Sequence, residues 1–246
     1  MKPCLVIPIY DHADTITSVV ESLAYLDLPC IIVDDGSHDE TRRALRELEA
    51  RFDWVAVAHH DRNRGRGAAL RTAYRTAAGR GFTHTVQLDA DGQHDARDVP
   101  RFLEAAAAEP DALVLGQPIF DDSAPFHRLH GRKLSQGIVW LETWSMAARD
   151  PLCGFRCIPL ASTLPVLDRA STGDRMEFDP ELIIRLMRAG TPVVNVPTRV
   201  QYREGGISHF RMGEDNLRIA WVYVRLAVES LWNRTRVVDA STPPRG

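Results

Sequence analysis

Short apolar runs alternate with amphipathic segments through the first half of the chain. The runs are typical of buried strands, and the segments between them carry apolar residues at helical spacing. We expect strands near residues 4–10, 31–35, 54–60, 83–89 and 112–119, and helices near 14–26, 39–51, 67–79 and 97–108. This alternation predicts a mainly parallel sheet covered by helices on both faces, with ligands bound at the carboxyl ends of its strands.

The second half is less regular. Its pattern predicts a helix near 129–147, a loop over Pro151–Pro159, a helix near 179–189 ended by Gly190, and a strand at Val193–Pro197. A polar loop follows from Tyr202 to Arg211. In the first half, Ser37 and Glu40 have the spacing of a capping box, which predicts the start of the helix near 39.

Polar side chains follow several of the predicted strands. Asp89 and Asp91 come directly after the apolar run that ends at Leu88. Two carboxylates at this spacing can reach one hard cation, and Mg²⁺ typically keeps one or two protein carboxylates. A cation held this way neutralises a leaving diphosphate. Aspartates are also frequent in surface loops, so the pair needs support from other motifs.

The segment Asn63–Gly67 precedes a predicted helix and contains two glycines. Glycines at a helix start let the backbone approach a ligand and expose amides to an anion. Arg66, between them, is a bidentate donor that can face a phosphate, or it is a solvated surface side chain.

Composition excludes some classes of protein. The chain has 246 residues, 44% of them hydrophobic and 26% charged, with a formal net charge of −3, so we expect a globular protein that binds no nucleic acid. Four cysteines, without zinc-ligand spacing, fit reduced thiols in the cytosol: Cys4, Cys30, Cys153 and Cys157. Neither a leader nor a spanning stretch is evident, so we expect a cytoplasmic protein, soluble or peripheral on the cytoplasmic face of a membrane.

Four segments in this order resemble the family-2 glycosyltransferases, especially the dolichyl-phosphate mannosyltransferase-like branch. They are Val6–Tyr10, Ile31–Ser37, Asn63–Leu70 and Gln87–His94. The resemblance extends to residue 220 or so. It implies a GT-A (Rossmann-like) α/β fold in one compact domain, a GDP- or UDP-linked sugar donor, Mg²⁺ or Mn²⁺, and inversion at the anomeric carbon.

The resemblance also implies the residues of the donor site. Metal ligands are expected at Asp89, Asp91 and Gln93, because the pattern Asp-x-Asp-x-Gln-His is complete. Donor contacts are expected from Pro8, Tyr10, Asp34, Asp35, Arg66, Gly67, Asp89, Ala90, Asp91 and, in a loop that closes over the diphosphate, Arg203, Ser208, His209 and Arg211. The family usually has Asn and Glu where this chain has Asp11 and His12, so no contact is expected from residue 12.

For the acceptor side, Asp150–Arg156 resembles the family's Gly-Phe-Arg segment, which implies that Arg156 binds the donor diphosphate or an acceptor phosphate. Glu177–Leu182 resembles an acidic segment in which Asp179 would accept a proton from an acceptor hydroxyl. Acidic residues also favour helix starts for electrostatic reasons alone. A phosphate acceptor needs no strong base, because it is already anionic. The expected catalytic residues are Asp179, Asp91 and Arg156.

We therefore expect a nucleotide-sugar half at 1–120, an acceptor half at 121–212, an amphipathic helix at 213–238 and a disordered tail at 239–246. The basic, aromatic-bearing stretch 217–238 either lies in a membrane interface or packs on the domain. Ser208–Arg211 and the residues after it resemble transferases of bacterial lipid and aryl-polyene pathways. The acceptor expected is lipid-linked, a polyprenyl phosphate or a lipid hydroxyl.

Three other functions are weighed against this one. A sugar nucleotidyltransferase would carry a glycine-rich, arginine-containing loop after the first strand, where this chain has Pro8–His12. A metal-dependent phosphatase with an aspartyl nucleophile would release phosphate from simple monoesters. A catalytically silent partner protein would bind the nucleotide sugar without transferring it.

Overall fold

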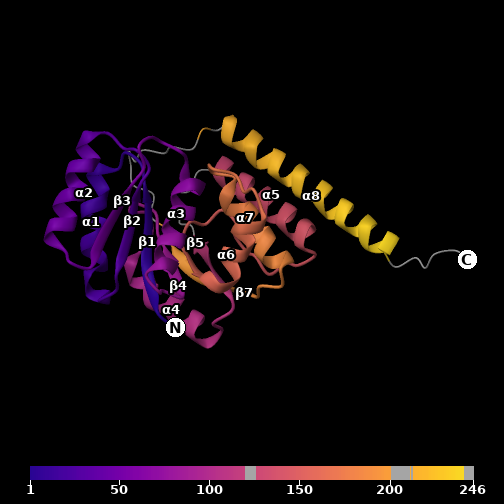
Figure 1. Cartoon of the computed structure of the whole chain (residues 1–246), viewed down its shortest axis with the longest axis horizontal. Helices are drawn as coiled ribbons and strands as arrows, with labels where there is room; N and C mark the ends of the chain where they lie inside the picture. The colour runs from indigo at the N-terminus through magenta and orange to yellow at the C-terminus, as the bar shows by residue number, and fades with distance from the viewer. Residues whose placement is uncertain (120–125, 201–210, 212, 241–246) are drawn as a thin grey trace, which may run out of the picture.

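Seven strands form one sheet in the described part of the chain (Figure 1). The computed structural model describes residues 1–119, 126–200, 211 and 213–240; the side chains of 126–130, 231 and 233–240 lie outside the description. The strands are β1 (Pro3–Ile9), β2 (Cys30–Asp34), β3 (Val55–His59), β4 (His84–Gln87), β5 (Leu113–Ile119), β6 (Arg156–Pro159) and β7 (Val193–Arg199). Their order is β3-β2-β1-β4-β6-β5-β7, and β6 alone among these runs antiparallel to its neighbours.

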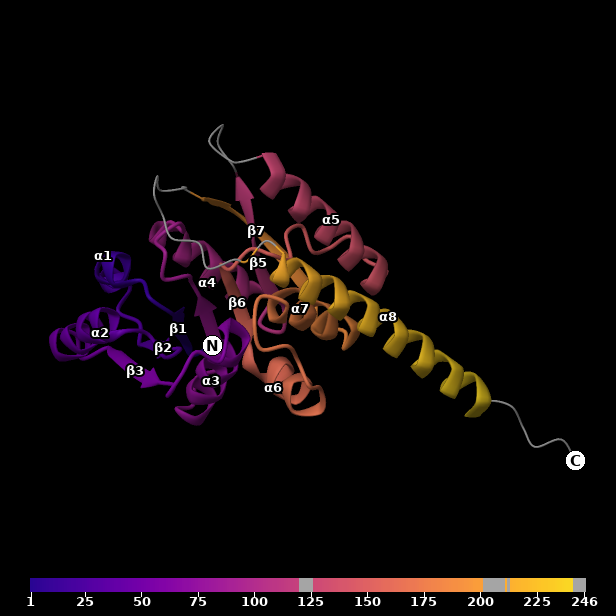
Figure 2. The ribbon, with the colours of Figure 1, turned by 90° about the horizontal axis from the view of Figure 1, so that it is seen from above.

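Helices cover both faces of this sheet (Figures 1 and 2). They are α1 (Ala13–Leu23), α2 (Asp39–Arg51), α3 (Arg66–Gly79), α4 (Val99–Ala108), α5 (Phe126–Thr143), α6 (Leu160–Arg169), α7 (Phe178–Arg188) and α8 (Glu214–Ala240), with short 3₁₀ turns η1 (Ala24–Leu26) and η2 (Ala96–Asp98). Along β1, Cys4 and Val6 enter one buried cluster, while Leu5 and Ile7 enter the other. A strand buried on both faces explains its uninterrupted apolar sequence.

The strands and helices predicted in the first half are confirmed, but part of the second half was predicted wrongly. The loop expected over Pro151–Pro159 contains β6, and α6 follows without having been predicted. β6 has only four residues and begins with a buried arginine, so its sequence lacks the alternation of a strand. Pro165 lies inside α6 and masks its helical pattern.

The predicted capping box is also wrong. Helix α2 begins at Asp39, with His38 at its N-cap and no side-chain cap. The Ser37 hydroxyl instead accepts a hydrogen bond from the Asp11 amide at 3.0 Å, and the Ser37 amide donates to Asp34 Oδ1 at 2.9 Å. Ser37 therefore ties together the ends of β1 and β2.

Helix α8 lies beside α5 and α7, and its C-terminal part extends beyond the body of the protein (Figures 1 and 2). Ile219, Val222, Tyr223 and Leu226 form its buried face. The Tyr223 hydroxyl shares a hydrogen bond with that of Ser135 on α5. Among the described residues, no helix is both long and apolar enough to cross a bilayer.

Replacing Phe102 with Ala should destabilise the protein strongly. Phe102 on α4 is fully buried, and its ring stacks on that of Phe155 at 4.0 Å between centroids. Truncating a buried Phe typically costs about 3–5 kcal/mol, because a cavity remains. Urea unfolding measures the change. Leu141→Ala, at an exposed position, serves as the control and should change the free energy of unfolding by less than about 0.5 kcal/mol; equal effects would contradict the prediction.

Candidate active site

A cleft of ≈ 910 Å³ opens at the carboxyl ends of β1, β2 and β4. Its volume falls in the range of about 300–1,000 Å³ that small-molecule sites occupy. One half is polar and is lined by Tyr10, Asp35, Asp89 and Asp91, which follow those strands. The other half lies between α5 and α8 and is largely apolar, with Leu134, Ile138, Ile219, Ala220 and Tyr223 along it.

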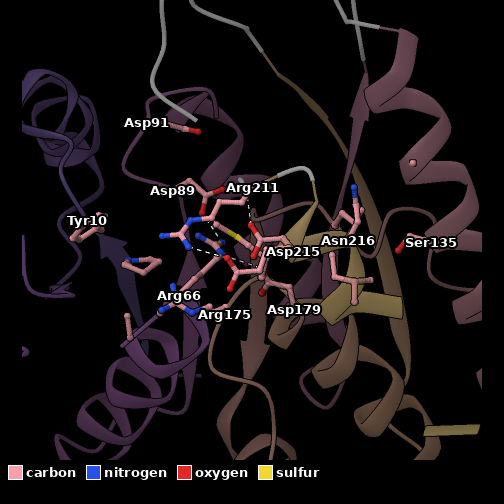
Figure 3. Close-up of a pocket in the computed structure, with 18 of the residues that line it drawn as sticks. Tyr10, Arg66, Asp89, Asp91, Ser135, Arg175, Asp179, Arg211, Asp215 and Asn216 are labelled. Carbon is pink, nitrogen blue, oxygen red and sulfur yellow. Dashed lines mark hydrogen bonds and ion pairs between the residues drawn. The ribbon is translucent and has the colours of Figure 1, made fainter. Parts of the chain in front are cut away.

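Four charged side chains of alternating sign form a chain beneath the polar half: Asp89, Arg66, Asp179 and Arg156. Figure 3 shows the first three. Arg66 Nη2 lies 2.6 Å from Asp89 Oδ1, and Arg66 Nε lies 2.8 Å from Asp179 Oδ2. Arg156 Nη1 donates to the other oxygen of Asp179 at 2.8 Å. The four residues come from α3, the end of β4, α7 and β6, so this chain of charges joins both halves of the sequence.

The pKa values of these groups follow from burial and from their neighbours. Burial alone would lower the pKa of Arg66, but the charges of Asp89 and Asp179 outweigh it and raise that pKa. Burial likewise opposes ionisation of Asp89, yet Arg66 and His94 hold its pKa well below the usual range. Burial, followed by the charge of Asp89, raises the pKa of Asp91. The two carboxylates therefore repel each other, and a cation beside both would relieve this repulsion.

The residues present fit a divalent cation that is shared with a ligand. His94 Nε2 lies 3.4 Å from Asp89 Oδ2, and the backbone N–H of Gln93 donates to Asp91 Oδ1 at 3.0 Å. Within the described ranges, no three His, Cys, Asp or Glu side chains gather to hold a metal by themselves. Two carboxylates with a nearby neutral Gln93 instead suit Mg²⁺ or a similar ion that takes its other ligands from phosphates and water.

Gly154 packs directly against the carboxylate of Asp89. A Cβ atom at this position would lie 2.7 Å from Asp89 Cγ and would clash with its Oδ2. Phe155, the next residue, packs its ring against His94 at 5.3 Å. The segment therefore positions Asp89 through the close approach of Gly154, and His94 through the ring of Phe155.

The structure does not support the predicted contact between Arg156 and a phosphate. Arg156 is fully buried, and its guanidinium donates to Asp179 and to the carbonyls of Cys153 and Pro151 at 2.7 and 2.9 Å. It therefore positions Asp179. Both oxygens of Asp179 accept hydrogen bonds from guanidinium groups, so its carboxylate is fixed between Arg66 and Arg156.

The two aspartates after β2 have different positions. Asp34 is fully buried and does not line the cleft, which is contrary to its predicted donor contact. Asp35 lines the cleft, and it also accepts hydrogen bonds from the amides of Arg64 at 3.0 Å and Gly65 at 2.7 Å. Its carboxylate therefore fixes the loop that leads into α3.

Gly67 does not line the cleft. A Cβ atom there would lie 2.5 Å from Phe178 Cβ, so the glycine makes room for the start of α7. The Ala68 amide, in the first turn of α3, donates to the Asp174 carbonyl at 3.1 Å. Residues 171–177 thus cover the N-terminus of α3, an arrangement that local sequence does not reveal.

The remaining predicted residues fall into two groups. Those that line the cleft are Pro8, Tyr10, Arg66, Asp89, Ala90, Asp91, Gln93, Asp179 and Arg211. Arg203, Ser208 and His209 lie outside the described residues.

Two arginines that line the cleft were not predicted from the sequence. Arg175 belongs to the segment before α7. Arg132 on α5 lies between the polar and apolar halves. Its Nη1 donates to both carboxylate oxygens of Asp150, at 2.7 and 2.9 Å. Neither lies in a recognisable motif, since only the packing of α5 and α7 on the sheet brings them to the cleft.

Gly154→Ala should weaken metal-dependent nucleotide binding while the protein stays folded. The added methyl group would push the Asp89 carboxylate, and displacing a supporting contact of a metal ligand typically costs about 10–100-fold in affinity. Calorimetry with Mn²⁺ and nucleotide measures the loss. Gly137→Ala on α5 is the matched control, because a Cβ atom there meets nothing within 4 Å. Equal affinities in the two variants would contradict this account of Gly154.

Curated relatives resemble the chain over most of its length. It is 27% identical to a polyprenol monophosphomannose synthase of Mycolicibacterium smegmatis over 231 residues, which cover 89% of this chain and 84% of the relative. It is also 27% identical to an undecaprenyl-phosphate mannosyltransferase of Micrococcus luteus, with 87% and 89% covered.

Solved structures share the fold. Glucosyl-3-phosphoglycerate synthase from Mycobacterium tuberculosis, in complex with Mn²⁺, UDP and glucosyl-3-phosphoglycerate, matches with a TM-score of 0.66 at 18% identity, covering 92% of this chain and 79% of that one. A mannosyltransferase from Pyrobaculum calidifontis, in complex with GDP-Man and Mn²⁺, gives 0.62 at 17% identity, covering 94% and 64%. The model of glycosyl transferase family 2 matches residues 4–156. The predicted family is thereby confirmed: this chain is a member of glycosyl transferase family 2.

Proposed function

We propose that the protein is an inverting, metal-dependent glycosyltransferase that moves a sugar from a GDP- or UDP-linked donor to a polyprenyl phosphate. The observation that carries this proposal is the composition of the cleft described above. Its polar half contains the carboxylate pair and several arginines, and its other half is largely apolar, with Arg132 and Ser135 among its residues. A polyprenyl phosphate has the same division, with a charged head and an apolar chain.

The polar half suits the donor diphosphate. Asp89, Asp91 and Gln93 would hold Mg²⁺ or Mn²⁺, and the bound ion would neutralise charge that develops on the leaving nucleoside diphosphate. Arg175 and Arg211 line the same half, where their charges stabilise that anion. Both solved structures named above contain Mn²⁺ with a nucleotide or a nucleotide sugar, which supports a divalent ion here.

The acceptor end suits a nucleophile that is already anionic. Asp179, the predicted base, has both carboxylate oxygens engaged by Arg66 and Arg156. A phosphate oxygen can attack the anomeric carbon in line with the departing diphosphate without losing a proton to the protein. The relatives named for polyprenol and undecaprenyl-phosphate chemistry support a phosphate acceptor.

The apolar half lies where the lipid chain of such an acceptor would start. Ile138 of α5 and Ile219 and Ala220 of α8 line it, and Arg132 stands at its junction with the polar half. Burying the first isoprene units there would gain about 25 cal/mol per Å² of apolar surface. The arginine would meet the phosphate at the head of the chain.

Helix α8 also offers a surface for peripheral contact with a membrane through residues 217–238. Large apolar side chains that are 55–73% exposed form a stripe on the face opposite its buried side: Leu217, Trp221, Val224, Val228 and Trp232. An apolar stripe with tryptophans is typical of helices that lie in the interface of a bilayer. Such contact would bring the apolar half of the cleft to the lipid that carries the acceptor.

One donor nucleotide should raise the melting temperature in a Mn²⁺-dependent manner. A ligand at 100 times its Kd stabilises the folded protein by about 2.7 kcal/mol. Thermal shift with GDP- and UDP-sugars, with and without Mn²⁺, identifies the base. The effect should vanish in Asp91→Asn and persist in Asp95→Asn, a control on the same loop whose carboxylate pairs with Arg97 instead. No response to any nucleotide would overturn the donor assignment.

Transfer should require the phosphate of the acceptor. We expect radiolabelled sugar to reach a polyprenyl phosphate in detergent micelles and the matching polyprenol to remain unlabelled, because Arg66 and Arg156 hold Asp179, the carboxylate predicted as the base. Labelling of the alcohol at a comparable rate would contradict the proposed nucleophile. Phosphate release from simple monoesters would favour a phosphatase, and nucleotide binding without transfer to any acceptor would favour a silent partner protein.

A further inference from the structure

The carboxylate of Glu181 on α7 is completely buried, yet it lies outside the cleft. Its Oε2 accepts a hydrogen bond from the Gly173 amide at 2.9 Å. Its Oε1 accepts from Arg185 Nε at 2.8 Å and from Arg225 Nη2 at 2.5 Å. A buried carboxylate is tolerated only when it is paired in this way, so each of these contacts compensates its charge.

One oxygen of Glu181 fixes the segment 171–177. Arg71 of α3 holds the same segment from the other side, through the Thr172 hydroxyl at 3.0 Å and the Gly173 carbonyl at 2.8 Å. The residues that follow, Arg175 and Met176, line the polar half of the cleft. The position of Gly173 therefore sets where Arg175, labelled in Figure 3, enters the polar half of the cleft.

The other oxygen of Glu181 fixes α8. Arg225 reaches it from α8, and Glu229, one turn further along that helix, pairs with Arg185 at 3.0 Å. Arg188 adds a hydrogen bond to the Leu226 carbonyl at 3.0 Å. Helix α8, which carries the exposed apolar stripe, is thus held on α7 by the Glu181 carboxylate, which also binds segment 171–177.

We propose that Glu181 is a positioning residue that couples the position of α8 on α7 to the donor site through segment 171–177. Loss of the Arg225–Glu181 contact then leaves the buried carboxylate under-compensated, shifts its bond to Gly173 and displaces Arg175 from the diphosphate. The inference rests on the proposed function, because it requires that the polar half bind a nucleotide sugar.

The test compares Glu181→Gln and Arg225→Gln with Val224→Ala, a control at an exposed position of α8 that lies outside the cleft lining and the Glu181 cluster. Gln at 181 cannot accept from Gly173 and both arginines as a carboxylate does. Calorimetry with Mn²⁺ and the donor nucleotide, without lipid, measures the Kd. Both test variants should bind about fivefold more weakly or worse, the lower end of typical coupling between sites. Val224→Ala should match the wild type.

Kinetics and rescue separate positioning from general destabilisation. KM for the donor should rise in both test variants, kcat should fall as well because Arg175 stabilises the leaving diphosphate, and Arg225→Lys should restore part of the affinity because it retains the charge. Should Glu181→Gln fail to fold, Arg225→Gln, which leaves Arg185 on the carboxylate, gives the answer. A lower melting temperature with wild-type donor affinity would overturn this inference alone. A wild-type protein that binds no nucleotide would overturn the proposed function and the inference with it.

Discussion

The buried chain of charges from Asp89 through Arg66 and Asp179 to Arg156 is the constraint on which the site depends. Each member is largely removed from water and is tolerated because the next carries the opposite charge. Since the four come from α3, α7, β6 and the end of β4, satisfying them forces these elements into one relative position. Removing either inner member, Arg66 or Asp179, would leave the charge at one end of the chain without its ion-pair partner.

This arrangement also suits the cleft to a divalent cation that is bound together with an anionic ligand. Arg66 already spans two carboxylates, and the unlike environments of Asp89 and Asp91 leave a repulsion that a divalent ion would relieve. Asp179, predicted as a base, is held between two guanidinium groups. The acceptor that we propose, a phosphate, brings its own negative charge and needs no such base.

Helix α8 has two apolar faces that do different things. The buried face packs near α5 and α7 and contributes Ile219 and Tyr223 to the cleft, whereas the opposite face leaves Trp221 and Val224 in contact with solvent. One helix therefore contributes both to the lining of the cleft and to the exposed surface of the protein. Through Glu181 the same helix is connected to the segment before α7.

The sequence by itself determined every strand of the described sheet except β6, most of the helices and the place of the carboxylate pair. Strand periodicity and the Asp89–Asp91 spacing are local properties, and parallel strands bring their carboxyl ends to one edge. Only the tertiary structure decided that Arg156 is a buried partner of Asp179, that Gly67 admits α7, and that Arg175 enters the cleft. These roles depend on contacts between segments far apart in the chain, and the same residue type serves ligand binding or packing according to what the fold places beside it.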